Sequence, residues 1–135
     1  GPGPGIAQIH VKTAEEAENW FNNVYPGRGY LDKPPDIYQR LATLVTDVGS
    51  IHYAAAILRE LADIRTARYQ PHFYEDDPKY NPASLTDLDM QVIYEAYQAG
   101  IQIPYQGSKG FQQATDPKTY GPRILPYLAF YRYKP

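Results

Sequence analysis

Apolar residues recur every three or four positions through residues 36–69. They are Leu41, Leu44, Val48, Ile51, Ala55, Leu58 and Ala62. This spacing predicts one face of a helix held against a partner. Asp36 follows two prolines and is expected to cap the start of the segment. The segment is the best candidate for the centre of the fold.

Gly49 and Ser50 leave two alternatives open in the middle of this segment. Gly can end one helix and Ser can cap the next, which gives two helices joined by a tight corner. The apolar spacing nevertheless keeps its phase through Gly49, as a continuous helix requires and a corner does not. The phase therefore favours one long helix, bent at Gly49. Its second half, with small Ala54–Ala56, is expected to be the most enclosed part of the protein, with Arg59, Glu60 and Asp63 on the exposed side.

Two further helices are predicted. The first covers residues 13–24, because Thr13 and Glu16 have the spacing of a capping box and an apolar face follows. That face comprises Ala17, Trp20, Phe21 and Val24. The second starts after Ser84 and ends at Gly100. Its apolar face comprises Leu85, Leu88, Val92, Ile93 and Ala96.

The remaining segments are predicted to be loops and short strands. Residues 25–35 contain helix-breaking Pro and Gly residues, residues 70–83 contain three prolines, and both segments should be loops. Residues 6–12, 101–105 and 123–135 have β-prone sequences. Pro126 restricts the last of these to the edge of a sheet, or else must lie among the first residues of the strand. The expected fold class is mainly α: a small domain of three to four helices around the central helical segment 36–69, with Pro-rich loops and minor β structure near the termini.

Residues 1–135 are expected to form a single domain, because this length suits one hydrophobic core. Residues 1–5 (GPGPG) are interpreted as a flexible lead or the remnant of a protease-cleavage site, and the chain as a possible segment of a longer polypeptide. Residues 101–135 are interpreted as a Tyr-rich, basic C-terminal extension that packs on the helical core.

Composition excludes several classes of function. With 43% hydrophobic and 21% charged residues, the chain is expected to be a soluble, folded protein. It contains no cysteine, which rules out disulfides, thiolate nucleophiles and zinc–thiolate sites. No apolar run approaches the ~20 residues that span a bilayer, and no signal peptide is visible, so the sequence predicts no membrane span and leaves the compartment open.

Charge is distributed unevenly along the second half of the chain. Residues 75–100 carry six acidic residues against one lysine, whereas residues 101–135 carry five basic residues against one aspartate. Regions of opposite charge can pair within one molecule or between neighbours in an assembly.

The sequence shows no recognised catalytic or metal-binding motif. His52 is expected to be a buried structural residue, and His72 precedes an acidic loop whose spacing fits neither a zinc nor an EF-hand site. Arg28 stands between two glycines on a loop tip that can hold an anion, although most such tips are simple turns. We therefore predict no catalytic residue, no metal and no cofactor, and the balance is against an enzyme.

The whole chain has 14 tyrosines against 4 phenylalanines, an excess that favours half-buried surfaces and interfaces. The C-terminal segment has the clearest functional pattern. It interleaves rings with positive charges. The expected interaction surface comprises Tyr120, Arg123, Tyr127, Tyr131, Arg132, Tyr133 and Lys134, with Arg28 in addition. Tyr and Arg dominate protein interfaces, the same mixture binds single-stranded nucleic acid, and the tail can also simply cover the acidic helix of its own chain.

These patterns lead to a ranked set of functions. The first is a non-enzymatic protein-interaction or assembly module, such as a domain of a viral or other multi-subunit structural protein, that binds a protein partner or associates with itself. The alternative is a nucleic-acid-binding domain that uses the C-terminal Tyr/Arg/Lys segment. A second alternative is an enzyme whose site is assembled from scattered residues and is not visible in the sequence.

Overall fold

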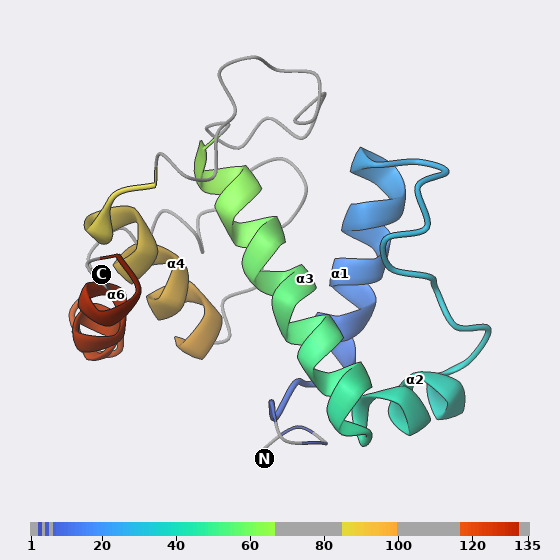
Figure 1. The fold of residues 1–135 in the computed structure, drawn as a ribbon. Helices are drawn as coiled ribbons and strands as arrows, with labels where there is room; N and C mark the ends of the chain where they lie inside the picture. Colours follow the sequence, from blue (N-terminus) through green and yellow to red (C-terminus); the bar gives the residue numbers. More distant parts are fainter. Residues whose placement is uncertain (1–2, 4, 6, 67–84, 100–116, 133–135) are drawn as a thin grey trace. The chain divides into compact units, whose positions relative to one another are not determined.

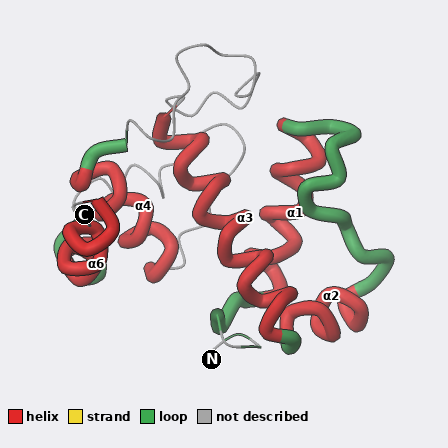
Figure 2. The backbone as a smooth tube through the Cα atoms, in the orientation of Figure 1, coloured by secondary structure: helices red, strands yellow, loops and turns green. Residues whose placement is uncertain are grey.

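The structure is a computed structural model that describes residues 3, 5, 7–66, 85–99 and 117–132, with the backbone alone at 64–66, 99 and 130–132. These residues form five α-helices and one 3₁₀-helix, without a strand (Figures 1 and 2). The mainly helical fold is therefore confirmed. The chain divides into two compact units, Gly1–Glu60 and Leu61–Pro135. That they form a single domain stays a prediction.

Helix α1 (Val11–Val24) opens the first unit, and it begins earlier than predicted. His10 occupies the N-cap without a side-chain hydrogen bond, so Thr13 lies inside the helix and does not cap it. The strand expected over 6–12 is wrong in its described part, because residues 7–10 form a turn and a short extended stretch that lead directly into α1. A short β-prone run without a partner strand has nothing to satisfy its backbone, whereas a helix satisfies itself.

The core of the first unit is built on aromatic rings. Trp20 is fully buried and lies edge-on to Phe21, with ring centroids 5.0 Å apart. The ring centroid of Tyr25 lies 5.8 Å from that of Trp20, and the ring centroid of Tyr30 lies 5.6 Å from that of Tyr25. Edge-to-face pairs at these distances are favourable. Part of the tyrosine excess therefore serves the core, where Tyr25 is 5% exposed.

Helices α2 (Ile37–Leu44) and α3 (Asp47–Thr66) replace the single long helix that the apolar phase favoured. The chain bends by 101° between them (Figure 1). Asp36 caps α2 as predicted, accepting a hydrogen bond from the Gln39 N–H. The corner lies at residues 45–46 rather than at Gly49, because the Thr46 hydroxyl accepts the Gly49 N–H at 3.0 Å and so starts α3.

Gly49 makes this corner possible by being small. A Cβ atom at Gly49 would lie 2.1 Å from the carbonyl oxygen of Thr43, far inside van der Waals contact. The same end of α2 also receives the N-terminal lead, where a Cβ atom at Gly5 would lie 2.0 Å from the Leu44 carbonyl oxygen. Glycine therefore permits close backbone approach on both sides of the α2 C-terminus.

The buried face of α3 is not the one that the apolar spacing predicts. Ser50, Tyr53 and Ile57 are buried, whereas Val48, Ile51, Ala55 and Leu58 are exposed. Glu60 and Asp63, expected on the exposed side, are buried as well. The reason lies in the corner, since breaking the helix at residues 45–46 frees α3 to turn a different face toward α1 than the phase of α2 implies.

The second unit contains α4 (Asp87–Ala99), η2 (Gly121–Ile124) and α6 (Leu125–Arg132). Helix α4 has the predicted extent, but Thr86 rather than Ser84 caps it, in a reciprocal arrangement with Asp89. Val92, Ile93 and Ala96 are buried as expected, while Leu88 is 54% exposed.

The strand expected over residues 123–135 is wrong in its described part, because η2 and α6 cover residues 121–132. Pro122 and Pro126 both fall within the first two residues of these helices, where a missing N–H costs nothing. The prolines that argued against a central strand are therefore compatible with two consecutive helix starts.

Several predictions fall on residues that the structure does not describe, namely the loop at 70–83, the strand at 101–105 and His72. Within the described ranges, no single helix is both long and apolar enough to cross a membrane. The bent pair formed by Ile37–Leu44 and Asp47–Asp63 passes that test together, by length and composition only.

Candidate functional site

A hydrogen-bonded group of three charged and polar side chains lies buried where the three helices of the first unit meet. Glu18 of α1 is fully buried and receives two hydrogen bonds of 2.7 Å from Arg40 of α2. The hydroxyl of Tyr53 on α3 donates a third, of 2.6 Å. Bidentate, charge-assisted hydrogen bonds fix both distance and orientation. We call these three residues the buried triad, and it joins α1, α2 and α3.

The buried triad is electrostatically self-consistent. The hydrogen bond from Arg40 to Glu18 raises the pKa of Arg40, whereas burial alone would lower that pKa. Burial and then the hydrogen bond to Glu18 raise the pKa of the Tyr53 hydroxyl. Both groups are therefore held in the protonated form that donates to the Glu18 carboxylate. A carboxylate that already accepts three hydrogen bonds is suited to a structural role rather than to proton transfer.

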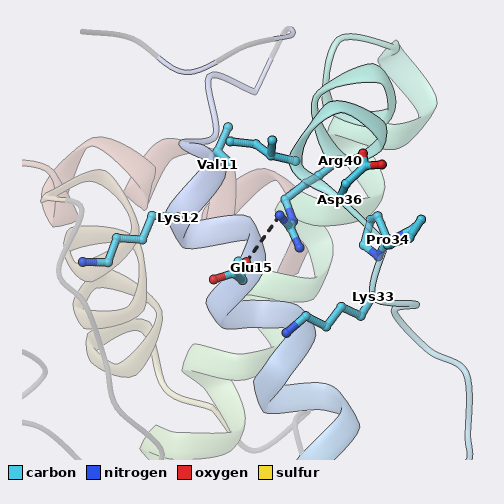
Figure 3. A pocket seen from close by; sticks show the side chains of 9 residues that line it. Val11, Lys12, Glu15, Lys33, Pro34, Asp36 and Arg40 are labelled. Carbon is cyan, nitrogen blue, oxygen red and sulfur yellow. Dashed lines mark ion pairs between the residues drawn. The ribbon is translucent and has the colours of Figure 1, made fainter.

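A pocket of about 480 Å³ opens beside Arg40 in the same unit (Figure 3). Its lining comes from Val11, Lys12 and Glu15 of α1, from the segment 33–36, and from Ile37 and Arg40 of α2. Arg40 uses its Nε and Nη2 on Glu18 and presents Nη1 to Glu15, 3.4 Å from a carboxylate oxygen. Glu15 is half exposed, while the Arg40 side chain is 4% exposed. The pocket thus combines the fixed cation of Arg40, the exposed carboxylate of Glu15 and apolar side chains such as Val11 and Ile37.

An exposed apolar surface lies on α3. Val48 is 82% exposed, Ile51 57% and Leu58 38%, and Ala55 between them is exposed too. Their spacing of three, four and three places them on one side of the helix. We call these four residues the α3 stripe. Large apolar side chains exposed together on one face are typical of a surface that contacts another protein.

The structure describes only part of the interaction surface predicted from sequence. The Arg123 guanidinium lies over the Tyr120 ring, 5.1 Å from its centroid, and Tyr127 is 69% exposed. Arg28 is exposed on the loop of the first unit, in a separate compact unit from these residues. The side chains of residues 131–134 are not among those that the structure describes. Their role in binding stays a prediction.

Glu95 organises the second unit. The residue is 7% exposed, and its carboxylate accepts hydrogen bonds from the N–H groups of Thr119 at 2.7 Å and Tyr120 at 3.0 Å. Burial alone would raise the pKa of Glu95, but these N–H groups, that of Gly121 and the charge of Arg123 outweigh it and lower the pKa. Glu95 thereby anchors the start of η2 to α4.

The remaining candidate residues show no assembled chemistry in the described ranges. His52 is exposed rather than buried, and its Nε2 lies 3.1 Å from the Tyr30 carbonyl oxygen. Asp89 is occupied in the cap of α4. Among the described side chains no group of three His, Asp or Glu is placed to hold a metal ion.

Sequence reasoning missed the buried triad and the α3 stripe. A signal for the first was present, because Glu18 falls at helical spacing from Ala14 and Phe21 and therefore on the apolar face of α1. A carboxylate there predicts a buried partner, and Arg40 is a candidate by charge. Nothing in the sequence distinguishes an exposed apolar stripe from a buried one.

Comparison of the chain with protein-family models, with curated proteins and with solved structures found no match.

Proposed function

We propose that the chain is a non-enzymatic assembly module that associates with a second copy of itself through the α3 stripe. The observation that carries this proposal is the exposure of Val48, Ile51, Ala55 and Leu58 on one helix face. Burial of such side chains against a partner contributes about 25 cal/mol per Å² of apolar area. Leaving them in water forfeits that gain.

A second copy fits because the stripe is self-complementary. Its spacing of three, four and three reads the same from both ends. In an antiparallel pair, Val48 therefore meets Leu58 of the second copy, and Ile51 meets Ala55. A two-fold interface requires this reciprocity of contacts. The small Ala55 opposite Ile51 permits the axis separation of about 8–10 Å at which helices pack.

Sedimentation equilibrium across a range of protein concentrations tests this proposal. We expect the mass to rise from monomer to dimer, and Ile51→Glu to abolish that rise because it buries an unpaired charge at the centre of the interface. Leu88→Glu is the matched control, since Leu88 is equally exposed but lies on α4. A monomer at every concentration, or equal effects of both substitutions, would contradict the proposal.

A second candidate function is binding of single-stranded nucleic acid by the C-terminal segment. It is favoured by Arg123 and Tyr120, which already place a cation over a ring, and by the exposed Tyr127 nearby in sequence. Binding of a labelled oligonucleotide at low salt, lost in Arg123→Ala with Tyr127→Ala, would support it. Unchanged binding in that double variant would exclude this surface.

A further inference from the structure

The pocket beside Arg40 has the chemistry of a carboxylate site. Arg40 is held by two hydrogen bonds to Glu18, so that its guanidinium is fixed before any ligand arrives. The remaining edge, at Nη1, faces the pocket and Glu15 (Figure 3). A preorganised donor spares a ligand the entropy of ordering it.

Glu15 shows that this edge of the Arg40 guanidinium can bind a carboxylate. Its Oε2 lies 3.4 Å from Nη1, longer than a good charge-assisted hydrogen bond of about 2.7–2.9 Å. With its side chain 49% exposed, Glu15 is free to move aside into solvent. The position is therefore filled by a weakly held carboxylate of the chain itself, which an external carboxylate of better geometry can replace.

The rest of the lining defines the other half of the ligand. Val11, Pro34, Pro35 and Ile37 supply apolar surface, and Ile37 is 49% exposed. Lys33 adds a positive charge, with its Nζ 2.9 Å from the Asn19 amide oxygen. Asp36 is committed to capping α2 through Gln39. Lys12 is the third basic residue of the lining, which also holds the carboxylates of Glu15 and Asp36. One negative charge matches this lining better than the two of a phosphate, because Glu18 already pairs with Arg40 and two further carboxylates lie beside the basic groups.

We propose that this pocket binds a carboxylate carried on an apolar group, with Arg40 and Lys33 on the carboxylate and Val11, Pro34, Pro35 and Ile37 on the apolar part. Two sources carry this chemistry, the C-terminus of a peptide that ends in an apolar residue and a free small acid. The site lies on a different part of the first unit from the α3 stripe and does not depend on self-association.

Binding is tested by titration of the ¹⁵N-labelled chain, followed by amide chemical shifts. The probes are N-acetylphenylalanine for a peptide terminus, 3-phenylpropionate for a free acid, the amide of each, and inorganic phosphate. We expect saturable shifts at the pocket for the carboxylates and not for the amides or phosphate. The tighter of the two carboxylates identifies the source.

Substitutions distinguish this site from non-specific association. Glu15→Gln removes the competing carboxylate and should tighten binding, by about two- to fivefold. Lys33→Ala should weaken it by a similar factor, whereas Lys118→Ala, an exposed lysine of the second unit, should change nothing. Arg40 itself is left intact because the fold depends on it.

Equal binding of amides and acids, or no tightening in Glu15→Gln, would overturn the proposal. The titration is repeated on the Ile51→Glu variant. Binding that persists there while dimerisation is lost keeps the pocket independent of the proposed assembly function. A wild-type chain that dimerises but binds neither carboxylate would disprove the pocket alone.

Discussion

The buried triad links the three helices of the first unit through one network of hydrogen bonds and charges. Glu18, Arg40 and Tyr53 come from three different helices and satisfy one another without solvent. A buried ion pair contributes little compared with an apolar replacement, but removing one partner alone leaves an uncompensated charge. The triad therefore specifies how α1, α2 and α3 meet more than it adds net stability.

Removing the cation should be far more damaging than removing both charges. We expect Arg40→Met to lower the free energy of unfolding by about 3–5 kcal/mol, because the Glu18 carboxylate stays buried and unpaired. Glu18→Gln with Arg40→Met should recover much of that loss. Urea denaturation followed by circular dichroism measures both. A double variant as unstable as Arg40→Met would show that the loss of stability comes from altered packing and not from the unpaired charge of Glu18.

The Tyr53 hydroxyl allows a smaller test of the same group. Tyr53→Phe deletes one hydrogen bond to a buried charge and should cost about 1.5–3 kcal/mol of unfolding free energy. Tyr127→Phe is the control, since Tyr127 is 69% exposed, and should be neutral. The two variants are compared in the same denaturation experiment. Equal stability of both would mean that the Tyr53 hydroxyl does not reach Glu18.

Glu95 makes the stability of the second unit sensitive to acid. The native pKa of Glu95 is lowered from its ordinary value of 4.5. The unfolded chain therefore takes up this proton first as pH falls. The stabilisation is present above about pH 4.5 and is lost as pH falls through the lowered native value.

Acid titration of thermal stability tests this dependence. The melting temperature of the wild type should decrease as the pH is lowered past about 4.5. The melting temperature of Glu95→Gln should be lower at neutral pH and should decrease less steeply over the same pH range. Asp87→Asn, a carboxylate at the start of the same helix, serves for comparison. Parallel curves for wild type and Glu95→Gln would contradict the role of Glu95.

At the scale of the elements, the corner between α2 and α3 decides the fold of the first unit. The Thr46 hydroxyl starts α3, and Gly49 lets the first turn of α3 approach the Thr43 carbonyl of α2. The corner sets which face of α3 is buried and which forms the α3 stripe. A substitution confined to the corner should therefore change the packing of the whole of α3.

Gly49→Ala should be destabilising, contrary to the usual effect of this change inside a helix. Alanine ordinarily favours a helix by about 1 kcal/mol over glycine. Here its Cβ would lie 2.1 Å from a backbone oxygen, and the overpacking should cost about 1–3 kcal/mol. Chemical denaturation measures the sign. A more stable Gly49→Ala variant would mean that the two helices do not approach as described.

At the scale of the whole molecule, the two proposed binding modes differ in their response to salt. Association through the α3 stripe is apolar and should be little changed, or slightly strengthened, between about 0.05 and 0.5 M salt. Nucleic-acid binding by the basic C-terminal segment should weaken steeply over the same range. Sedimentation and oligonucleotide titration in parallel therefore separate them. Self-association that disappears with salt would point to the oppositely charged segments 75–100 and 101–135 instead.

The predicted and observed elements agree where a helix is specified locally. The apolar faces of residues 13–24 and 85–99 and the Asp36 cap can be read from spacing of three and four residues and from cap chemistry. The helical C-terminal segment was missed because alternating rings suggested strand pairing, although Pro122 and Pro126 also suit two helix starts. A strand needs a partner, and the local pattern does not say whether one exists.

The sequence by itself determined the helical class, the approximate extent of α1 and α4 and the start of α2, because these depend on contacts within a few residues. Only the tertiary structure decided the corner at residues 45–46, the pairing of Glu18 with Arg40 and Tyr53, and the exposure of the α3 stripe. An apolar stripe has the same spacing whether it faces a core or the solvent. Which of the two it faces depends on residues distant in sequence, and here on the room that one glycine leaves beside the Thr43 carbonyl.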